Sequence, residues 1–113
     1  DFTLPSSYAA MSRLLKRRED FTAVFASSDI IAIGATKALS DRGYTVPGDV
    51  SVVGFDGTEQ ADYCIPSLAT MRQPSEHMAH MSVELLLEGM QGKEGRHVLL
   101  PPKWIESESI RKL

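Results

Sequence analysis

Two short polar segments supply the hydroxyl and carboxylate groups that are best placed to bind a ligand. Ser27-Ser28-Asp29 follows one apolar run of the sequence, and Asp56-Gly57 follows another. If both runs are strands of one parallel sheet, their carboxyl ends open onto the crevice where such sheets bind ligands. A carboxylate accepts hydrogen bonds from neighbouring hydroxyl groups, so this pattern suits a polyhydroxy ligand.

Structural roles offer an alternative explanation for each of these residues. The helix expected after Ser28 needs an N-cap, and Asp29 is the favoured candidate. Asp56 could instead stabilise a turn with Gly57. Phe2 could stack on a sugar face, although general burial tendencies favour a core role. The residue types alone leave both explanations open.

No residue pattern in the sequence indicates catalysis or a metal site. His77 and His80 lie three residues apart on an expected helix with Glu84 one turn further, but a solvated helix face is the better interpretation because no second ligand set occurs. Neither a nucleophile with a base partner, nor a P-loop, nor GxGxxG is evident. Cys64 lacks an activating signature and is expected to pack as a small hydrophobic residue. We therefore expect a binding module without enzymatic activity, metal or cofactor.

Apolar periodicity predicts alternating helices and strands. Ser7 is expected to cap a first helix that ends near residues 18–20, and the continuous apolar run 22–26 is typical of a strand covered on both faces. The further predicted elements are a helix at 30–42, a strand at 50–55, a helical turn at 59–63, a strand at 68–73, a helix from Ser75 through Met90, and short strands at 98–100 and 104–105. Strands joined by helices of this length form βαβ units, so the predicted fold class is α/β, a parallel sheet with flanking helices.

Composition favours a globular domain that does not itself bind nucleic acid. The chain has 113 residues, of which 42% are hydrophobic and 24% charged, and its formal net charge is -3. An acidic balance disfavours direct contact with phosphate backbones. The single Cys64 fits a reducing compartment, and no apolar run approaches the roughly 20 residues needed to cross a bilayer. Because the first residue is Asp1 instead of Met, we expect the chain to continue upstream.

Four motifs occur in a fixed order along the sequence. They are FASSD at 25–29, AIGA at 32–35, VPGDVSVVGFD at 46–56 and IPSLATMRQP at 65–74, followed by an expected helix and by LLPP at 99–102. In order and spacing, along nearly the whole chain, the sequence resembles the LacI/GalR family of bacterial transcription regulators.

This resemblance implies the type I periplasmic-binding-protein fold, in which two α/β lobes joined by three crossover segments hold an effector between them. The chain would be a C-terminal fragment of that effector-binding domain. Residues 1 to about 71 would belong to the C-terminal lobe, and residues of about 74–103 would return to the N-terminal lobe. The helix-turn-helix domain would lie outside the chain.

The resemblance also implies site residues. The aromatic residue matching Phe2 packs against the effector, the position matching Ser28 often carries an amide that hydrogen-bonds to it, and the residue matching Asp56 accepts hydrogen bonds from sugar hydroxyls. Asp29 matches a helix cap beside the site, and Gln73 matches a crossover position that can reach the cleft. These five are the predicted ligand-binding residues.

A second set of residues matches surfaces that the family uses to dimerise. The predicted interface residues are Ile30, Ile33, Tyr63, Cys64 and Ile65. The sequence departs from the family in having Ser28 where Asn is common, and in reading Ser107-Glu108-Ser109-Ile110 where Arg-Glu-Ser-Thr is frequent.

The function implied by the resemblance is regulation of transcription. We expect a cytoplasmic homodimer that binds a small polar effector such as a sugar, has no membrane contact, and meets operator DNA only through the missing N-terminal domain. The alternative is a periplasmic sugar-binding protein of a transport system, which shares the fold. The segment at 65–74 favours the regulator, because transport proteins usually carry a different linker there.

Overall fold

The structure is a computed structural model that describes residues 2–17 and 20–112, and its elements alternate as expected. In chain order they are α1 (Leu4–Leu15), β1 (Ala23–Phe25), α2 (Asp29–Asp41), β2 (Ser51–Asp56), α3 (Glu59–Tyr63), β3 (Ala69–Arg72), α4 (Ser75–Met90) and β4 (Lys103–Ile105). From β1 to α4 every predicted element is present, with ends within a residue of the expected bounds.

The first helix begins earlier than predicted. Thr3 is its N-cap, and the Oγ1 atom of Thr3 accepts a hydrogen bond from the Ser6 backbone N–H at 3.3 Å. Pro5 is compatible with this start, because the first turn of a helix has no intrahelical acceptor for the N–H that proline lacks. The prediction that Ser7 caps this helix is therefore wrong: Ser7 lies inside α1 and is buried.

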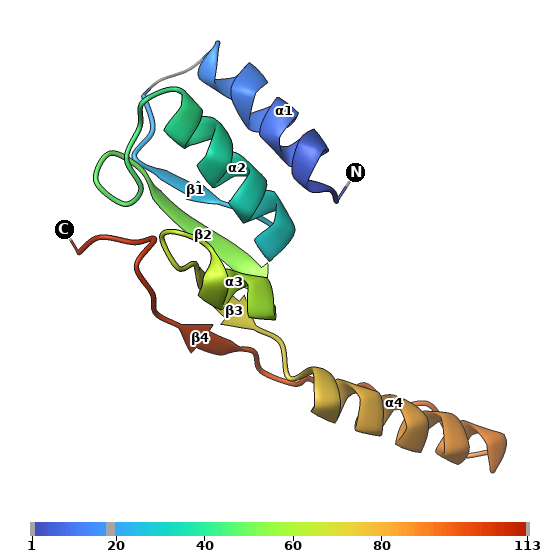
Figure 1. Ribbon diagram of the computed structural model, residues 1–113. Coiled ribbons are helices and arrows are strands. Elements are labelled where there is room, and N and C mark those ends of the chain that lie inside the picture. The colour runs from blue at the N-terminus through green and yellow to red at the C-terminus, as the bar shows by residue number, and fades with distance from the viewer. Residues whose placement is uncertain (1, 18–19, 113) are drawn as a thin grey trace.

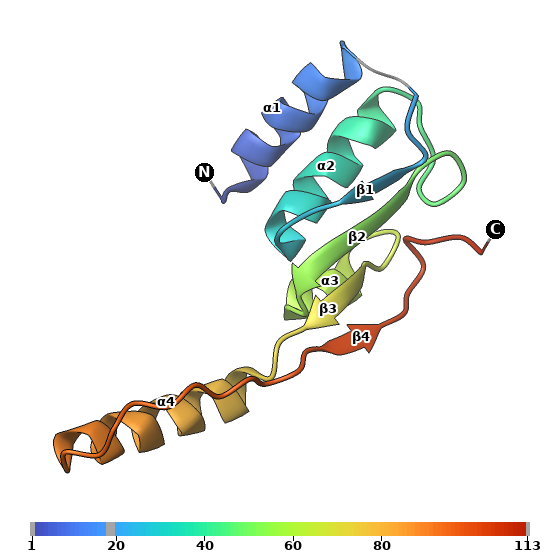
Figure 2. The ribbon, with the colours of Figure 1, turned by 180° about the vertical axis from the view of Figure 1, so that it is seen from behind.

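The four strands form one sheet in the order β1-β2-β3-β4. The first three strands are parallel, and β4 runs antiparallel to β3. Because β1 and β2 are parallel neighbours joined by α2, the predicted βαβ unit and its parallel sheet are confirmed. The carboxyl ends of β1 and β2 lie at the same end of the molecule as the N-terminus of α1 (Figures 1 and 2).

Helices cover one face of this sheet. Figure 1 shows α2 and α3 in front of the strands, and Figure 2 shows the strands in front of both helices. In β1, Ala23 and Phe25 are exposed while Val24 is half-buried. The prediction that this strand is covered on both faces is therefore wrong for the described residues, because no described element packs on its second face.

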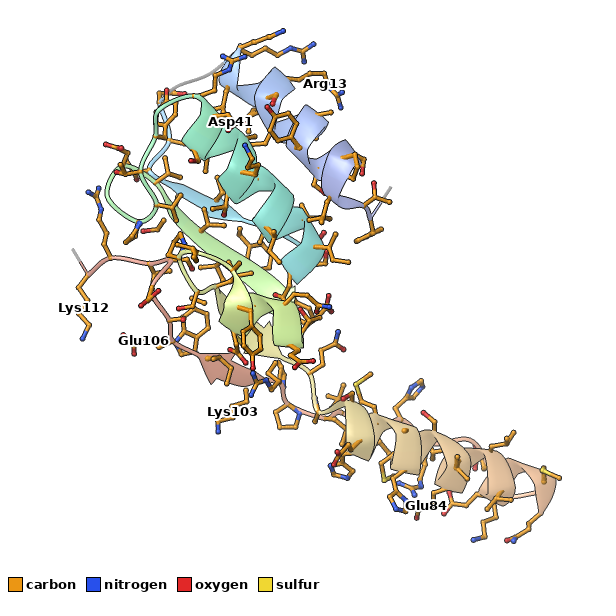
Figure 3. All side chains as sticks on the ribbon, viewed as in Figure 1. Arg13, Asp41, Glu84, Lys103, Glu106 and Lys112 are labelled. Carbon is orange, nitrogen blue, oxygen red and sulfur yellow. The ribbon has the colours of Figure 1, made fainter. Side chains whose placement is uncertain are left out.

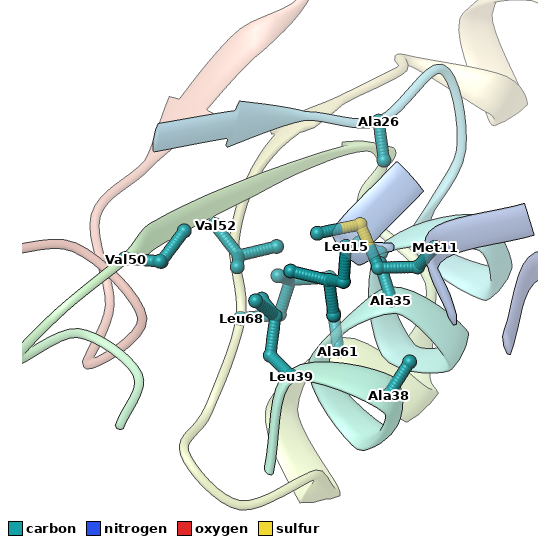
Figure 4. Close-up of a cluster of buried hydrophobic side chains, with 11 residues drawn as sticks. Met11, Leu15, Ala26, Ala35, Ala38, Leu39, Val50, Val52, Ala61 and Leu68 are labelled. Atoms are coloured by element: carbon teal, nitrogen blue, oxygen red, sulfur yellow. The ribbon is translucent and has the colours of Figure 1, made fainter. Parts of the chain in front are cut away.

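The hydrophobic core lies between the sheet and α2 and extends to α1. Leu39 of α2 is fully buried, as are Val50 and Val52 at β2. Met11 and Leu15 join the same cluster from α1 (Figure 4). Helix α1 therefore packs on α2, while α2 packs on the sheet.

A polar contact also joins the middle of α1 to the C-terminal end of α2. The Tyr8 hydroxyl donates a hydrogen bond to Asp41 at 2.9 Å, and Asp41 is ion-paired with Lys37 (Figure 3). Tyr8, Lys37 and Asp41 together line part of a hollow between the two helices.

Helix α4 and the chain that follows it project away from the sheet. None of the residues of α4 is buried, and residues 91–102 return along the helix without forming a strand (Figures 1 and 2). The strand predicted at 98–100 is therefore wrong, because no described strand lies beside this segment to accept its hydrogen bonds. Ser75 does not cap α4 as predicted, since Pro74 occupies the N-cap position and no side chain caps the helix.

The last segment of the chain returns to the sheet after β4. The buried Ser109 hydroxyl donates to the Val52 carbonyl at 2.6 Å and accepts from the Ala69 N–H at 2.8 Å. Ser109 thereby bridges β2 and β3 near their amino ends, which aligns the carboxyl ends that carry the site.

Candidate functional site

The carboxyl ends of β2 and β3 bring two of the predicted ligand-binding residues together. Asp56 is the last residue of β2, and Gln73 directly follows β3. The Gln73 Nε2 atom donates to Asp56 Oδ1 at 2.7 Å, and the Gln73 backbone N–H donates to the Asp56 carbonyl at 3.0 Å. Both side chains are half-buried, so this pair is fixed in position and still reaches the surface.

The backbone at this point makes an unusually sharp turn. Asp56 has φ 122°, and Gly57 has φ 71°. A Cβ atom on Gly57 would lie 2.4 Å from the Arg72 Cβ, so only glycine fits against β3. Strained conformations of non-glycine residues persist only where the surroundings fix them, and they cluster at functional sites.

A hollow of about 350 Å³ opens beside this turn. It is lined by Asp56, Gly57, Thr58, Gln73, Ser75 and Met78. The lining supplies carboxylate and amide oxygens as acceptors, and amide and hydroxyl groups as donors. Such a set of groups hydrogen-bonds to a polar ligand but contains no nucleophile paired with a base.

Asp29 lies close by but faces the interior. The residue is fully buried. Its Oδ2 atom accepts from the Thr58 N–H at 2.6 Å and from the Thr58 hydroxyl at 3.0 Å, while Oδ1 accepts from the Thr70 hydroxyl at 2.6 Å. Both carboxylate oxygens are thus engaged with protein donors, so Asp29 supports the site and does not open onto the hollow.

Ser28 has the capping role that the sequence assigned to Asp29. Its backbone is extended, and its Oγ accepts a hydrogen bond from the Ile31 N–H at 3.3 Å. The expectation that Asp29 is the N-cap is therefore wrong, because Asp29 is the first residue of α2 and its side chain turns to β3. Ser28 is itself buried and does not line the hollow.

Phe2 is placed differently from the core role that the general tendency favoured. Its side chain is 69% exposed, just before the start of α1. That end of α1 lies at the same end of the molecule as the carboxyl ends of the strands, which leaves the ring free to contact a ligand or another segment.

The predicted interface residues divide into exposed and half-buried side chains. Tyr63 is 79% exposed and Ile65 is 95% exposed, and Ile30 is also exposed. Ile33 and Cys64 pack in part against the core. Burial raises the pKa of the Cys64 thiol. A contiguous patch of exposed apolar side chains is unusual on the surface of a monomer.

Three residues near the site were missed by sequence reasoning. Arg72 contacts the turn through its Nε, which donates to the Gly57 carbonyl at 3.3 Å, and lies 3.4 Å from an Asp62 oxygen of α3. Thr58 and Thr70 hold Asp29. Their types gave no signal, because threonine is common in strands and at helix starts. Only the pairing of β2 with β3 reveals their roles.

Two further features concern metals and membranes. Within residues 2–17 and 20–112, no group of three or more His, Cys, Asp or Glu side chains gathers to hold a metal ion. No helix of the described chain is both long and apolar enough to cross a bilayer.

Comparison with known protein families places this geometry in context. The model of the periplasmic binding protein-like domain family matches residues 1–110. The HTH-type transcriptional regulator MalR of Clostridium butyricum is 44% identical over 110 residues, which cover 96% of this chain and 33% of that protein. The chain therefore spans about a third of the length of the curated relatives it matches.

Solved structures of similar proteins share the fold. The transcriptional regulator CelR in complex with cellobiose has a TM-score of 0.91 and 37% identity, covering 96% of this chain and 34% of CelR. The Lac repressor dimer bound to operator and the anti-inducer ONPF has a TM-score of 0.90 and 31% identity, covering 97% and 39% of the two chains. These proteins contain the same arrangement of helices and strands within a longer chain.

Proposed function

Because this chain belongs to the periplasmic binding protein-like domain family, in the form found in LacI-type transcriptional regulators, we propose that it senses an effector for such a regulator. The effector is a small polar molecule such as a sugar. Its binding shifts the balance between arrangements of two lobes and thereby changes how operator DNA is bound. The protein so described acts in the cytoplasm and catalyses no reaction.

The main structural support for this proposal is the hydrogen-bonded pair of Asp56 and Gln73, which lines the hollow of about 350 Å³ beside the turn. Gln73 binds the Asp56 carboxylate through Oδ1, and within residues 2–17 and 20–112 no protein group donates to Oδ2. A free carboxylate oxygen beside an amide can accept and donate hydrogen bonds to adjacent hydroxyl groups of one ligand. The CelR complex with cellobiose is a relative whose bound molecule has this chemistry. Phe2 supplies an apolar surface against which a sugar ring can stack.

The proposal also divides the chain between the two lobes of the effector-binding domain. Residues 1 to about 71 form part of the C-terminal lobe, and residues of about 74–103 extend to the N-terminal lobe. The absence of any buried residue in α4 supports this, since a helix with Val83, Leu86 and Met90 exposed at its surface needs a partner. DNA contact belongs to a helix-turn-helix domain outside these 113 residues, because the chain itself carries a net charge of -3.

Two copies of the regulator pair through the apolar residues at the start of α2 and after α3. Ile30, Tyr63 and Ile65 expose apolar surface that a second copy would bury. Ile33 and Cys64 lie at the edge of that surface. The Lac repressor relative is described as a dimer, and this chain is proposed to share that assembly.

The decisive measurement is the intact mass and N-terminal sequence of the native protein. A native chain about three times as long as this one, with the additional residues on its N-terminal side and a helix-turn-helix pattern at its start, supports the regulator. A mature chain that starts just after a cleaved signal peptide identifies a periplasmic solute-binding protein instead and removes the DNA mechanism.

The ligand class is tested separately by calorimetric titration of the native protein. Cellobiose and lactose are the sugar probes, and adenine and guanine are the comparators for a flat nucleobase ligand. Binding of a disaccharide that Asp56→Asn abolishes supports the proposed site. If only a nucleobase binds, the effector is a polar molecule of a different class from a sugar. If a disaccharide binds with the same affinity to Asp56→Asn as to the parent protein, the proposed site is contradicted.

A further inference from the structure

The buried carboxylate of Asp29 joins three elements of the fold beside the proposed ligand site. Asp29 begins α2, Thr58 follows the turn after β2, and Thr70 lies within β3. Three donors converge on the carboxylate, two of them at 2.6 Å. Short hydrogen bonds to an ionised acceptor are among the stronger hydrogen bonds in proteins, so this cluster is a rigid junction.

The neighbouring sequence is shaped around this carboxylate. A Cβ atom on Gly54 would lie 2.4 Å from Asp29 Oδ1, and Gly54 pairs directly with Thr70 across the sheet. The Asp29 carboxylate therefore fills the space above β2 that any larger residue at position 54 would occupy. Its position in the first turn of α2 also favours a negative charge, because the helix N-terminus is electropositive.

The junction is linked to Asp56 through a very short stretch of backbone. Thr58 lies two residues after Asp56, and both Asp56 and Gly57 have positive φ. A strained conformation of this kind is kept only when it is held from both sides. Gln73 holds the turn on one side through the Asp56 carbonyl and carboxylate, and Asp29 holds it on the other through Thr58.

We propose that the cluster of Asp29, Thr58 and Thr70 positions the Asp56 carboxylate for the ligand, with the Thr70 hydroxyl as a positioning group that the ligand never touches. Thr70 is fully buried, so its effect must pass through Asp29. The part of this inference that concerns ligand affinity rests on the proposed function, in which Asp56 contacts the effector.

The test compares Thr70→Val with Thr70→Ser in the native protein, of which this chain is a part. Valine keeps the shape of threonine and removes the hydroxyl, which leaves one oxygen of a buried carboxylate without its donor. Serine keeps the donor. Amide hydrogen exchange at Thr58, whose N–H donates to Asp29, should accelerate about tenfold in Thr70→Val, the scale of one hydrogen bond to a charged group, and stay near the parent rate in Thr70→Ser. Exchange in α1 should be unchanged in both.

Two exchange results would overturn the proposal. One is an unchanged exchange rate at Thr58 in Thr70→Val. The other is a uniform acceleration that includes α1, because this reports a general loss of stability. Either result shows that Thr70 has only an ordinary packing role.

A titration of the native protein with cellobiose and lactose separates this inference from the proposed function. If the parent protein binds a disaccharide, Thr70→Val should weaken that binding by at least fivefold and Thr70→Ser should not, and equal affinities in the parent and Thr70→Val would overturn the proposal. If the parent binds neither sugar, the proposed ligand class fails, while the exchange comparison still decides whether the cluster fixes the turn.

Discussion

At the scale of single residues, Asp56 combines a strained backbone with a proposed ligand contact. A φ of 122° suits glycine far better than aspartate. We therefore expect Asp56→Gly to change the free energy of unfolding by less than about 0.5 kcal/mol, because the relief of strain offsets the lost hydrogen bond to Gln73 and the greater freedom of glycine in the unfolded chain. The same change should abolish binding of the disaccharide probe.

Urea unfolding followed by circular dichroism measures the first effect. Gln60→Gly is the matched control, since Gln60 is an exposed residue of α3 where glycine should cost about 1 kcal/mol. A loss of stability in Asp56→Gly as large as that in the control would show that the turn is not strained.

Cys64 provides a second prediction at this scale, because it is the single cysteine of the chain. Burial raises the pKa of its thiol in the folded protein. The pH at which the alkylation rate reaches half its maximum should therefore be higher in the folded chain than in the chain unfolded in urea. A thiol with a raised pKa favours folding in its neutral form, so this contribution is complete below the unfolded pKa and is lost as the pH rises above it.

Iodoacetamide labelling over a range of pH, read by mass spectrometry, gives both profiles. Identical midpoints in the folded and unfolded chains would contradict the partial burial of Cys64. A midpoint that falls on folding would point to a nearby positive charge instead.

At the scale of elements, the close contact of α1 with α2 depends on Gly34. A Cβ atom at this position would lie 2.6 Å from the Ser7 Cβ and 2.9 Å from the Leu4 carbonyl oxygen. We expect Gly34→Ala to lower the free energy of unfolding by about 2 kcal/mol, the usual cost of overpacking. The gain in helix propensity is smaller than this cost.

Gly89 of α4 is the matched control for this prediction. It is also a helical glycine, but a Cβ atom there would meet nothing within 4 Å. Gly89→Ala should leave stability unchanged or raise it by up to about 1 kcal/mol. If both variants shift the urea midpoint in the same direction, α1 and α2 do not pack as closely as the structure shows.

At the scale of the whole molecule, the chain is elongated, with extents of 58 × 27 × 23 Å. The long dimension comes from α4 and the segment that returns along it (Figure 3). Leu86 is 64% exposed and Met90 is 76% exposed, so the isolated 113-residue chain carries apolar surface without cover in the described structure. We expect this chain to self-associate in solution as its concentration rises.

Light scattering across a concentration series measures this association. Leu86→Gln should lower it, whereas Glu84→Gln, a change at a neighbouring polar position of the same helix, should not. A monomer at every concentration would mean that the exposed face of α4 is too small or too divided to bind a second copy.

The sequence alone determined the type and order of most elements. Helix and strand patterns are local, so the apolar periods of 30–42 and 50–55 were sufficient to predict α2 and β2. The same reasoning placed Asp56 at the end of an apolar run, and Pro74 marked Gln73 as the last residue of the next predicted strand. The predictions of a helix cap at Ser7 and of a strand at 98–100 were wrong. The start of a helix depends on which side chain caps it, and a strand depends on a neighbouring strand to pair with, and the local pattern shows neither.

Only the tertiary structure decided which of the two carboxylates is open to a ligand. Asp29 and Asp56 both follow apolar runs, and the sequence favoured a helix cap for Asp29 while it left a ligand contact open for each. In the folded chain Thr70 and Thr58 close around Asp29, whereas Asp56 is held at the surface by Gln73. The difference arises because hydrogen-bond partners across a parallel sheet come from positions far apart in the chain, and the register of β2 against β3 selects them.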